Sequence, residues 1–360
     1  TVQPNNNSFN NDFAWGVRTG GTDTKFTGPD QNHTPGGNKY IYADPSQGQQ
    51  NTTTIITTPC IDLTNVNPNK CYAFEFWYHM YGRDMGNLLV DVDNGSNTEA
   101  WQNRVFLIRK EQQNSEDDPW QRGIIPLEDY IGEFIRIRFR APKQTPNNGN
   151  NARGDLAIDD LRIYEPPQDD AEMLSIENPL ENQCSYSANE DLSVIVRNAG
   201  CDSIKNLPID YRLTFNGTAN PVQSSSVSVN LGLGDTTIVN ISSVFNMTAL
   251  GDYVVEAWVD LPNDNIAAFD TVVTDTFEHK ASFGTFPEVV NFENVPVGSS
   301  QTGSAAWTAK TGPDPNFVWK VESNFTPTRG TGPKDGYYRK GQFIYTEASS
   351  SSGNVPTYLE

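Results

Sequence analysis

The chain has 360 residues, of which 19% are charged, and its formal net charge is −20 at pH 7. This length is enough for two or three domains that each bury a core of their own. A chain this acidic lacks the clusters of Lys and Arg that bind phosphates. We therefore expect no nucleic-acid partner. No apolar run approaches the roughly 20 residues of a membrane-spanning helix, so we expect no direct membrane insertion.

Short runs of Val, Ile, Phe and Tyr alternate with Asn, Thr, Ser, Gly and Pro, a pattern typical of strands joined by turns. The clearest early strand is 135–140, IRIRFR, whose period of two predicts one buried face and one solvated face. Pro166 and Pro167 break the strand pattern and indicate a linker. We therefore expect a first β-sandwich domain over residues 1–165.

The middle of the chain predicts a second sandwich. Residues 209–215 alternate apolar and polar side chains and run into Asn216-Gly217, a strong hairpin signal. Residues 253–259 alternate in the same way, and 192–196 supply a further apolar strand. An Ig-like sandwich over residues 169–278 is the expected packing of these strands.

An internal repeat relates the two ends of the chain. At one constant offset, Phe13, Trp15, Val17 and Thr27-Gly28-Pro29 recur as Phe317, Trp319, Val321 and Thr331-Gly332-Pro333. Residues 40–42 recur as 343–345, one residue out of step. The segment 285–360 is therefore expected to be the first half of a second copy. It carries residues that the first copy lacks, including Phe292-Glu293, so we expect an opening strand to be missing from the first copy.

The four cysteines fall as two neighbouring pairs, Cys60 with Cys71 and Cys184 with Cys201, without the CxxC spacing of zinc or redox sites. We expect each pair to form a disulfide within its own domain. Such bridges persist in oxidising compartments, which predicts a secreted or cell-surface protein. Four free, buried thiols are the alternative.

A change of apolar phase marks the end of the first domain. Leu156 and Ile158 are at even-numbered positions, whereas Leu161 and Ile163 are at odd-numbered positions. The apolar side chains can stay on one face of the strand only if one residue is inserted, which predicts a β-bulge at Asp159-Asp160. A bulge brings two carboxylates together, and a cation, a backbone donor or a proton must then relieve their repulsion. Hard oxygen ligands suit Ca²⁺. A bound Ca²⁺ and hydrogen-bonded structural carboxylates are both consistent with this pattern.

No catalytic residues are expected, and the chain is predicted not to be an enzyme. The histidines His33, His79 and His279 lie far apart in sequence, and no HExxH, GxSxG or P-loop motif is present. The tryptophans Trp15, Trp77, Trp101, Trp120 and Trp258 could offer stacking faces for sugars. On sandwich strands, however, aromatic side chains favour the core.

The run 76–82, FWYHMYG, resembles the MAM domain family, whose consensus carries a closely similar run on a central strand. The loop Thr27-Gly28-Pro29 and the segment 154–161, GDLAIDDL, which is similar to the family's GDIALDDI signature, support the resemblance. It covers residues 1–165, and 287–360 resemble the first half of another copy. The resemblance implies a β jelly roll used for adhesion or recognition outside cells.

The same resemblance implies a metal near the 27–29 loop. Asp23 and Asp30 are candidate ligands there, in addition to Asp159 and Asp160. The family's Asp in its D-H-T step is Asn32 in this chain, which removes one expected carboxylate.

The second domain is similar to CARDB-type or Ig-like modules, on the basis of Cys184, the strand 194–198 and Gly200. MAM units that alternate with such modules resemble Bacteroidetes cell-surface adhesins exported by the type IX secretion system. We therefore expect a non-catalytic binding or adhesion region of a larger secreted protein, with an extracellular glycan or protein as its ligand. The alternatives are an accessory targeting region of a secreted peptidase or glycosidase whose catalytic domain lies outside this chain, and an inert spacer.

Overall fold

The computed structural model describes residues 14–46, 52–93, 101–143, 153–181, 183, 185–264 and 266–280, with shorter stretches beyond residue 280. Apart from one 3-10 turn, Glu128–Tyr130, the regular elements of these residues are strands. The predicted all-β fold is therefore confirmed. In the part of the chain that the structure describes, no helix is long and apolar enough to cross a membrane.

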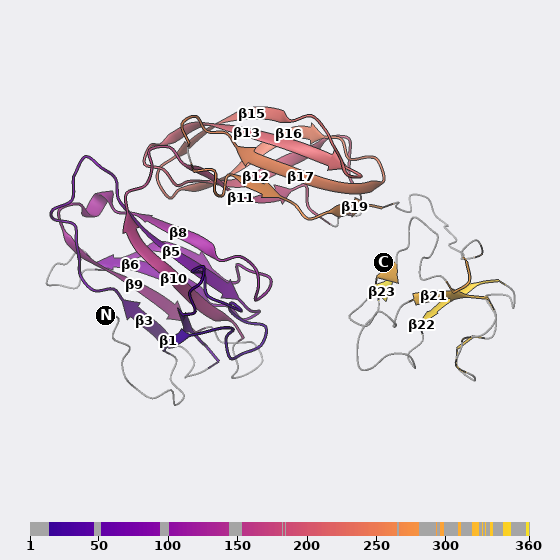
Figure 1. The fold of residues 1–360 in the computed structure, drawn as a ribbon, viewed down its shortest axis with the longest axis horizontal. Coiled ribbons are helices and arrows are strands. Elements are labelled where there is room, and N and C mark those ends of the chain that lie inside the picture. The colour runs from indigo at the N-terminus through magenta and orange to yellow at the C-terminus, as the bar shows by residue number, and fades with distance from the viewer. Residues whose placement is uncertain are drawn as a thin grey trace.

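The first domain consists of two antiparallel sheets (Figure 1). One sheet has the order β1 (Trp15–Arg18), β2 (Tyr40–Ala43), β10 (Asp155–Tyr164), β5 (Ala73–Tyr81) and β8 (Gln121–Pro126). The other has the order β3 (Thr53–Thr57), β9 (Phe134–Pro142), β6 (Asn87–Asp93) and β7 (Trp101–Arg109), and β4 (Ile61–Asp62) also pairs with β9. Two packed sheets are the layering that a jelly-roll sandwich requires.

The core of the first domain lies between these sheets. Strand β9 buries four apolar residues in it: Ile135, Ile137, Phe139 and Ala141. The arginines of the same strand point to the opposite side, where Arg138 and Arg140 donate to buried Asp91 of β6 at 2.7 and 2.6 Å. The predicted alternation over 135–140 is confirmed, with the difference that the polar face is held by ion pairs rather than simply solvated.

The second domain is also a two-sheet sandwich. Its first sheet has the order β11 (Ala171–Asn178), β12 (Glu190–Asn198) and β16 (Thr236–Phe245). Its second sheet has the order β14 (Thr218–Ala219), β13 (Ile204–Phe215), β17 (Gly251–Val259) and β18 (Thr271–Val273), with β15 (Gln223–Leu231) on β13 and β19 (Phe277–His279) on β17. Asn216 and Gly217 both adopt positive φ, 46° and 75°, and form the predicted hairpin turn.

A charged network joins the two sandwiches. Arg122 of β8 donates to Glu75 of β5 at 2.6 Å and also pairs with Glu172 of β11. Arg197 of β12 pairs with Glu172 and donates through Nη1 to the Arg122 carbonyl at 2.6 Å. Both glutamates and Arg197 are buried. Because these groups come from both domains, the network favours one relative orientation.

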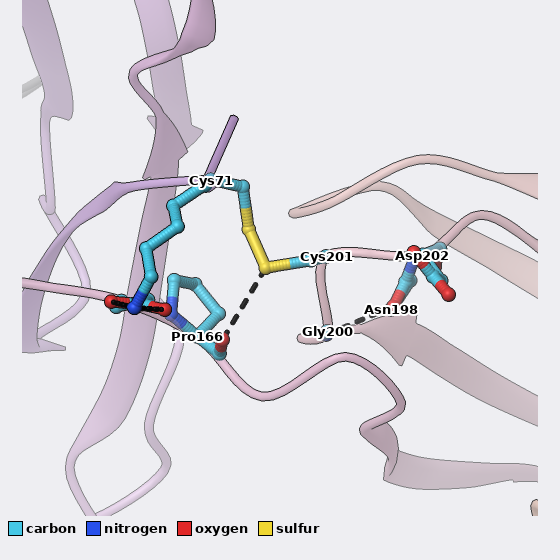
Figure 2. Close-up of a disulfide and its surroundings, with 8 residues drawn as sticks. Cys71, Pro166, Asn198, Gly200, Cys201 and Asp202 are labelled. Atoms are coloured by element: carbon cyan, nitrogen blue, oxygen red, sulfur yellow. Dashed lines mark hydrogen bonds and ion pairs between the residues drawn. A yellow bond between two sulfur atoms is a disulfide. The ribbon is translucent and has the colours of Figure 1, made fainter. Parts of the chain in front are cut away.

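A disulfide crosses the same junction, and the predicted pairing is wrong for the cysteines that form it. Figure 2 shows Cys71 bonded to Cys201. Their Cα atoms lie 6.0 Å apart. Cys60 is a free, exposed thiol. Cys60 precedes β4, which belongs to one sheet, whereas Cys71 leads into β5 of the other sheet beside the linker. The Cys201 backbone N–H donates to the carbonyl of Pro167 in that linker at 2.8 Å. Cys184 lies outside the described residues.

The third segment is described only in part. Strand β21 (Trp319–Glu322) pairs with β22 (Phe343–Thr346), with Val321 opposite Ile344. In the first domain β1 pairs with β2, and Val17 stands opposite Ile41. Two further strands, β20 (Ala309–Lys310) and β23 (Tyr358–Leu359), pair with each other.

Candidate functional site

The predicted β-bulge lies on strand β10. The pairing of β10 with β5 runs regularly to Asp159 opposite Trp77 and resumes at Arg162 opposite Glu75. Asp160, between these pairs, has a φ of 46°. Because the bulge occupies the outer face of the sheet, it turns two neighbouring carboxylates towards the loop of residues 30–37.

Donors from that loop surround both carboxylates. The His33 backbone N–H donates to Asp159 Oδ2 at 3.0 Å. Asp160 accepts from Thr34 Oγ1 at 2.6 Å, and its other oxygen lies 2.7 Å from His33 Nδ1. Partial burial raises the pKa of Asp160, but hydrogen bonds from Thr34 and His33 outweigh it, so this pKa lies below its ordinary value. Hydrogen bonds from protein donors therefore offset the repulsion between the two carboxylates.

Aromatic rings gather beside the bulge. The His33 ring stacks on Trp77, with centroids 3.9 Å apart and an interplanar angle of 15°. Trp120 lies 6.2 Å from His33, and exposed Phe269 of the second domain lies 5.7 Å from Trp77. We call His33, Trp77, Trp120, Asp159, Asp160 and Phe269 the aromatic–carboxylate cluster. Sequence reasoning placed such tryptophans in the core, but Trp77 and Trp120 remain partly exposed.

The other two predicted metal ligands do not join this cluster. Asp23 forms an ion pair with Arg18 at 2.6 Å, and its side chain is 64% exposed. Asp30 is exposed, and its backbone N–H donates to the Glu116 carbonyl at 2.8 Å. Within the described ranges, no three acidic, His or Cys side chains are grouped as metal ligands. Calcium binding by the four predicted aspartates therefore stays a prediction.

Sequence reasoning missed a different acidic residue, Asp155, at the start of β10. Asp155 is fully buried, and Thr27 donates to its Oδ2 at 2.8 Å. Its Oδ1 has no hydrogen-bond partner among the described residues. Burial, together with the charge of buried Asp44, raises the pKa of Asp155 to about 7. Both residues lie in motifs that the sequence analysis noted: Asp155 in GDLAIDDL and Thr27 in the 27–29 loop. These two motifs were the sequence signals for this position.

The surroundings of Asp155 fit a hard cation. Asp44 and Asp155 supply two buried carboxylates, and the hydroxyls of Thr22 and Thr27 lie against Asp155. Ca²⁺ prefers oxygen ligands of this kind, and a cation would relieve both the charge repulsion and the unpartnered oxygen. The donors therefore match the metal that the MAM resemblance implies near the 27–29 loop, although the residues differ from those predicted.

Two vertebrate proteins resemble about half of the chain. MAM domain-containing protein 2 of Homo sapiens is 31% identical over 189 residues, which are 51% of this chain and 24% of that protein. Neuropilin-1 of Gallus gallus is 27% identical over 197 residues, which are 52% of this chain and 20% of that protein. The chain thus spans about a quarter or less of the length of these relatives.

Solved structures give weaker likenesses. A CARDB domain from Pyrococcus furiosus is 19% identical and covers 32% of this chain and 94% of its own, with a TM-score of 0.21. Bacteroides uniformis beta-glucuronidase 2 is 11% identical and covers 78% of this chain and 32% of its own, with a TM-score of 0.34. Scores this low carry no argument about function. The family match is specific to the first sandwich: residues 6–167 match the model of the MAM domain, meprin/A5/mu.

Proposed function

We propose that this chain is a non-catalytic extracellular binding region whose first domain contacts a glycan or protein ligand through the aromatic–carboxylate cluster. The observation that carries the proposal is the cluster itself. It presents two partly exposed rings, Trp77 and Trp120, around His33, which contacts the Asp160 carboxylate. The Asp160 side chain is 37% exposed. Rings that offer an apolar face next to hydrogen-bond acceptors suit sugars and polar protein loops.

The environments of the histidines support a non-catalytic role. His79 is fully buried, and burial lowers its pKa to about 4, so it is neutral and closed off from substrates at physiological pH. His279 Nδ1 lies 2.8 Å from the Met247 carbonyl, and His33 is held by Asp160. None of the three stands beside a Ser or Cys nucleophile in the hydrogen bonds of the described residues, as a general base would.

The secreted or cell-surface location belongs to the same proposal. A disulfide between two domains persists only where the compartment is oxidising, and Cys71–Cys201 is such a bond. MAM domains of the matched relatives are the basis for an adhesive role. A Bacteroidetes adhesin exported by the type IX system is the parent that we propose.

We also propose that the third segment begins a second MAM-like unit. The β21–β22 pairing repeats the register of β1–β2. Gly28 and Gly332 both have positive φ, and a Cβ on either would lie 2.6 Å from the Cγ2 of Thr22 or Thr326, respectively. Repeated units raise effective ligand concentration, which favours adhesion by weak individual contacts.

Binding of the intact chain to glycan arrays and to intact cells tests the proposed site. Asp160→Asn should weaken binding by roughly tenfold, because a charge-assisted contact is lost. Asn tolerates positive φ well, so the bulge should persist. Trp258→Ala in the second domain is the matched control for Trp120→Ala, since both tryptophans are partly exposed.

Loss of binding to deglycosylated cells would identify a glycan, and unchanged binding would identify a protein ligand. The proposal fails if Asp160→Asn and Trp120→Ala bind as well as the unmodified chain while their melting temperatures are unchanged. Turnover of peptide, ester or glycoside substrates by the chain would contradict the non-catalytic part.

A further inference from the structure

The sheet of β3, β9, β6 and β7 carries a row of arginines on its outer face. On β9, Arg136, Arg138 and Arg140 alternate with the buried apolar residues of the core, so all three lie on the face that points away from the core. Arg136 forms an ion pair with Asp93 of β6. Arg138 and Arg140 instead share a single carboxylate, that of Asp91.

A third arginine meets the same carboxylate. The Arg104 backbone N–H donates to Asp91 Oδ1 at 2.8 Å, and Arg140 Nη2 donates to the same oxygen at 3.0 Å. Three arginines therefore surround one aspartate, and the ion pairs of the described residues leave two positive charges uncompensated. In a chain whose formal net charge is −20, this local excess of positive charge indicates an anionic ligand.

Two of these guanidinium groups are fixed in place by the protein. Asp91 is fully buried and accepts from Nε of Arg138 and of Arg140, at 2.7 and 2.6 Å. Arg138 also lies over the Trp101 ring, 4.0 Å from its centroid, and donates through Nη2 to Asn103 at 3.2 Å. Side chains that are already ordered lose little conformational entropy when a ligand binds, which favours affinity.

Donor groups of this face are still available to a ligand. In the described structure, Nη1 of Arg138 and Nη1 of Arg140 have no hydrogen-bond partner, and the two side chains are 19% and 22% exposed. Arg104 is exposed. A guanidinium offers paired donors that match the oxygens of an oxyanion. The second domain contacts the other sheet, through Arg122 of β8 and Trp77 of β5.

We propose that Arg104, Arg138 and Arg140, which we call the arginine face, bind an acidic glycan, a polysaccharide that carries carboxylate or sulfate groups. Neighbouring side chains on one face of a strand lie about 6.7 Å apart, so the charges form a row that suits the repeated charges of an extended chain. The centre of a specific protein interface is depleted of charged side chains, whereas the centre of this face is charged. The inference goes beyond the proposed adhesive site, because the aromatic–carboxylate cluster is itself acidic and its Asp159 and Asp160 belong to the other sheet.

Binding of the intact chain to dextran sulfate and to polygalacturonate, with neutral dextran for comparison, tests the proposal. We expect saturable binding to at least one polyanion, no binding to dextran, and weaker binding as salt is raised, because the contact is electrostatic. The polyanion that binds identifies the charged group as sulfate or carboxylate. Arg104→Asn should weaken binding by about three- to fivefold, and the charge reversal Arg104→Asp by roughly tenfold. Asn and Asp both tolerate positive φ, which Arg104 adopts at 63°.

Arg153→Asn and Arg153→Asp are the matched controls. Arg153 is an exposed arginine of the same domain, and its backbone N–H also donates to an aspartate, to Asp84 Oδ2 at 3.1 Å. These controls should bind within about twofold of the unmodified chain. Equal weakening by the Arg104 and Arg153 variants would reduce the binding to non-specific attraction and would overturn the proposal.

Arg138→Lys tests the geometry of recognition separately from charge. It should weaken binding severalfold with the net charge unchanged, because Lys donates as a point charge and lacks the paired donors. The proposal fails if neither polyanion binds, or if Arg104→Asp binds as well as the unmodified chain at an unchanged melting temperature. Asp160→Asn should leave polyanion binding unchanged, which separates this inference from the proposed adhesive site.

Intact cells distinguish the two macromolecular ligands that share this charge. Enzymatic removal of acidic glycans should abolish the part of cell binding that Arg104→Asp also removes. If that part survives the treatment, the arginine face binds an acidic protein segment and the glycan proposal is wrong.

Discussion

Gly28 and Gly36 lie in the same loop region and both have positive φ, 58° and 74°. A Cβ at Gly28 would lie 2.6 Å from Thr22 Cγ2 and 3.0 Å from Asp155 Cβ, whereas a Cβ at Gly36 would meet nothing within 4 Å. Gly28→Ala combines backbone strain with overpacking and should lower the free energy of unfolding by about 2–4 kcal/mol. Gly36→Ala carries the strain alone, about 1 kcal/mol. Urea denaturation of both variants measures the difference, and equal losses would show that the Thr22 contact is not restrictive.

Burial of Asp155 gives the first domain a specific pH dependence. Its pKa rises from 3.8 to about 7 on folding, so the folded state binds this proton more tightly than the unfolded state. The free energy of unfolding should therefore fall as pH rises from about 4 to about 7. Asp155→Asn should remove this contribution and stabilise the calcium-free domain at pH 8 by about 1–2 kcal/mol, less than the full shift because Asp44 shares the charge.

Calcium should reverse the effect in the unmodified chain. A cation that binds only the folded state raises the melting temperature by mass action, and a chelator should lower it again. Asp155→Asn should lose this response, while Asp23→Asn, at an exposed ion pair, should keep it. Burial also raises the pKa values of Asp170 and Asp270, to about 7 and about 6. These two residues are the same in every variant, so the difference between variants reports Asp155 alone. Full calcium stabilisation of Asp155→Asn would exclude this position as a ligand.

At the scale of the element, the outer face of β9 depends on Asp91 of the neighbouring strand β6. Asp91 is fully buried and stands opposite Arg138. Burial raises its pKa, but contacts with Arg140, the Arg104 N–H and Arg138 outweigh this, so the pKa lies below its ordinary value. This contribution to stability is present above about pH 4 and is lost as pH falls through the lowered folded pKa.

Replacement of Asp91 by Asn should lower the free energy of unfolding by about 3 kcal/mol, because two arginines lose the charge that compensates them. Asp252→Asn, on the exposed side of β17, should change stability by less than about 0.5 kcal/mol. Denaturation at pH 7 and again near pH 3 checks both the magnitude and its loss in acid. A constant difference between the two pH values would show that the charge of Asp91 is not the stabilising feature.

In the whole molecule, the Cys71–Cys201 bond links positions 130 residues apart. Closing so long a loop restricts the unfolded chain and stabilises the folded one by roughly 4–5 kcal/mol in the chain-entropy model. Cys201→Ser should lower the melting temperature and widen the range of domain orientations in small-angle scattering, while both sandwiches stay folded. Cys60→Ser should change neither property, because this thiol is exposed and free.

Peptide mapping without reductant checks the connectivity directly. A linked pair of peptides containing Cys71 and Cys201, with Cys60 open to alkylation, is the expected result. A Cys60–Cys71 peptide would restore the sequence-based pairing and would leave the junction without a covalent link.

Local patterns in the sequence determined the strands, the Asn216-Gly217 turn and the bulge at Asp159-Asp160. Each depends on backbone geometry within a few residues, where the alternation of side chains and the preference for positive φ act directly. The first domain's likeness to MAM domains was also readable, because the 76–82 run and the GDLAIDDL segment are contiguous.

The tertiary structure alone decided which distant residues meet. It joined Cys71 to Cys201 because the linker folds the second sandwich back against the end of β5, a contact that spacing between cysteines does not encode. It buried Asp155 beside Asp44, and it stacked His33 on Trp77. Disulfides, buried charges and ring contacts depend on separations of a few ångströms in space, and those separations follow from how the sheets pack rather than from order along the chain.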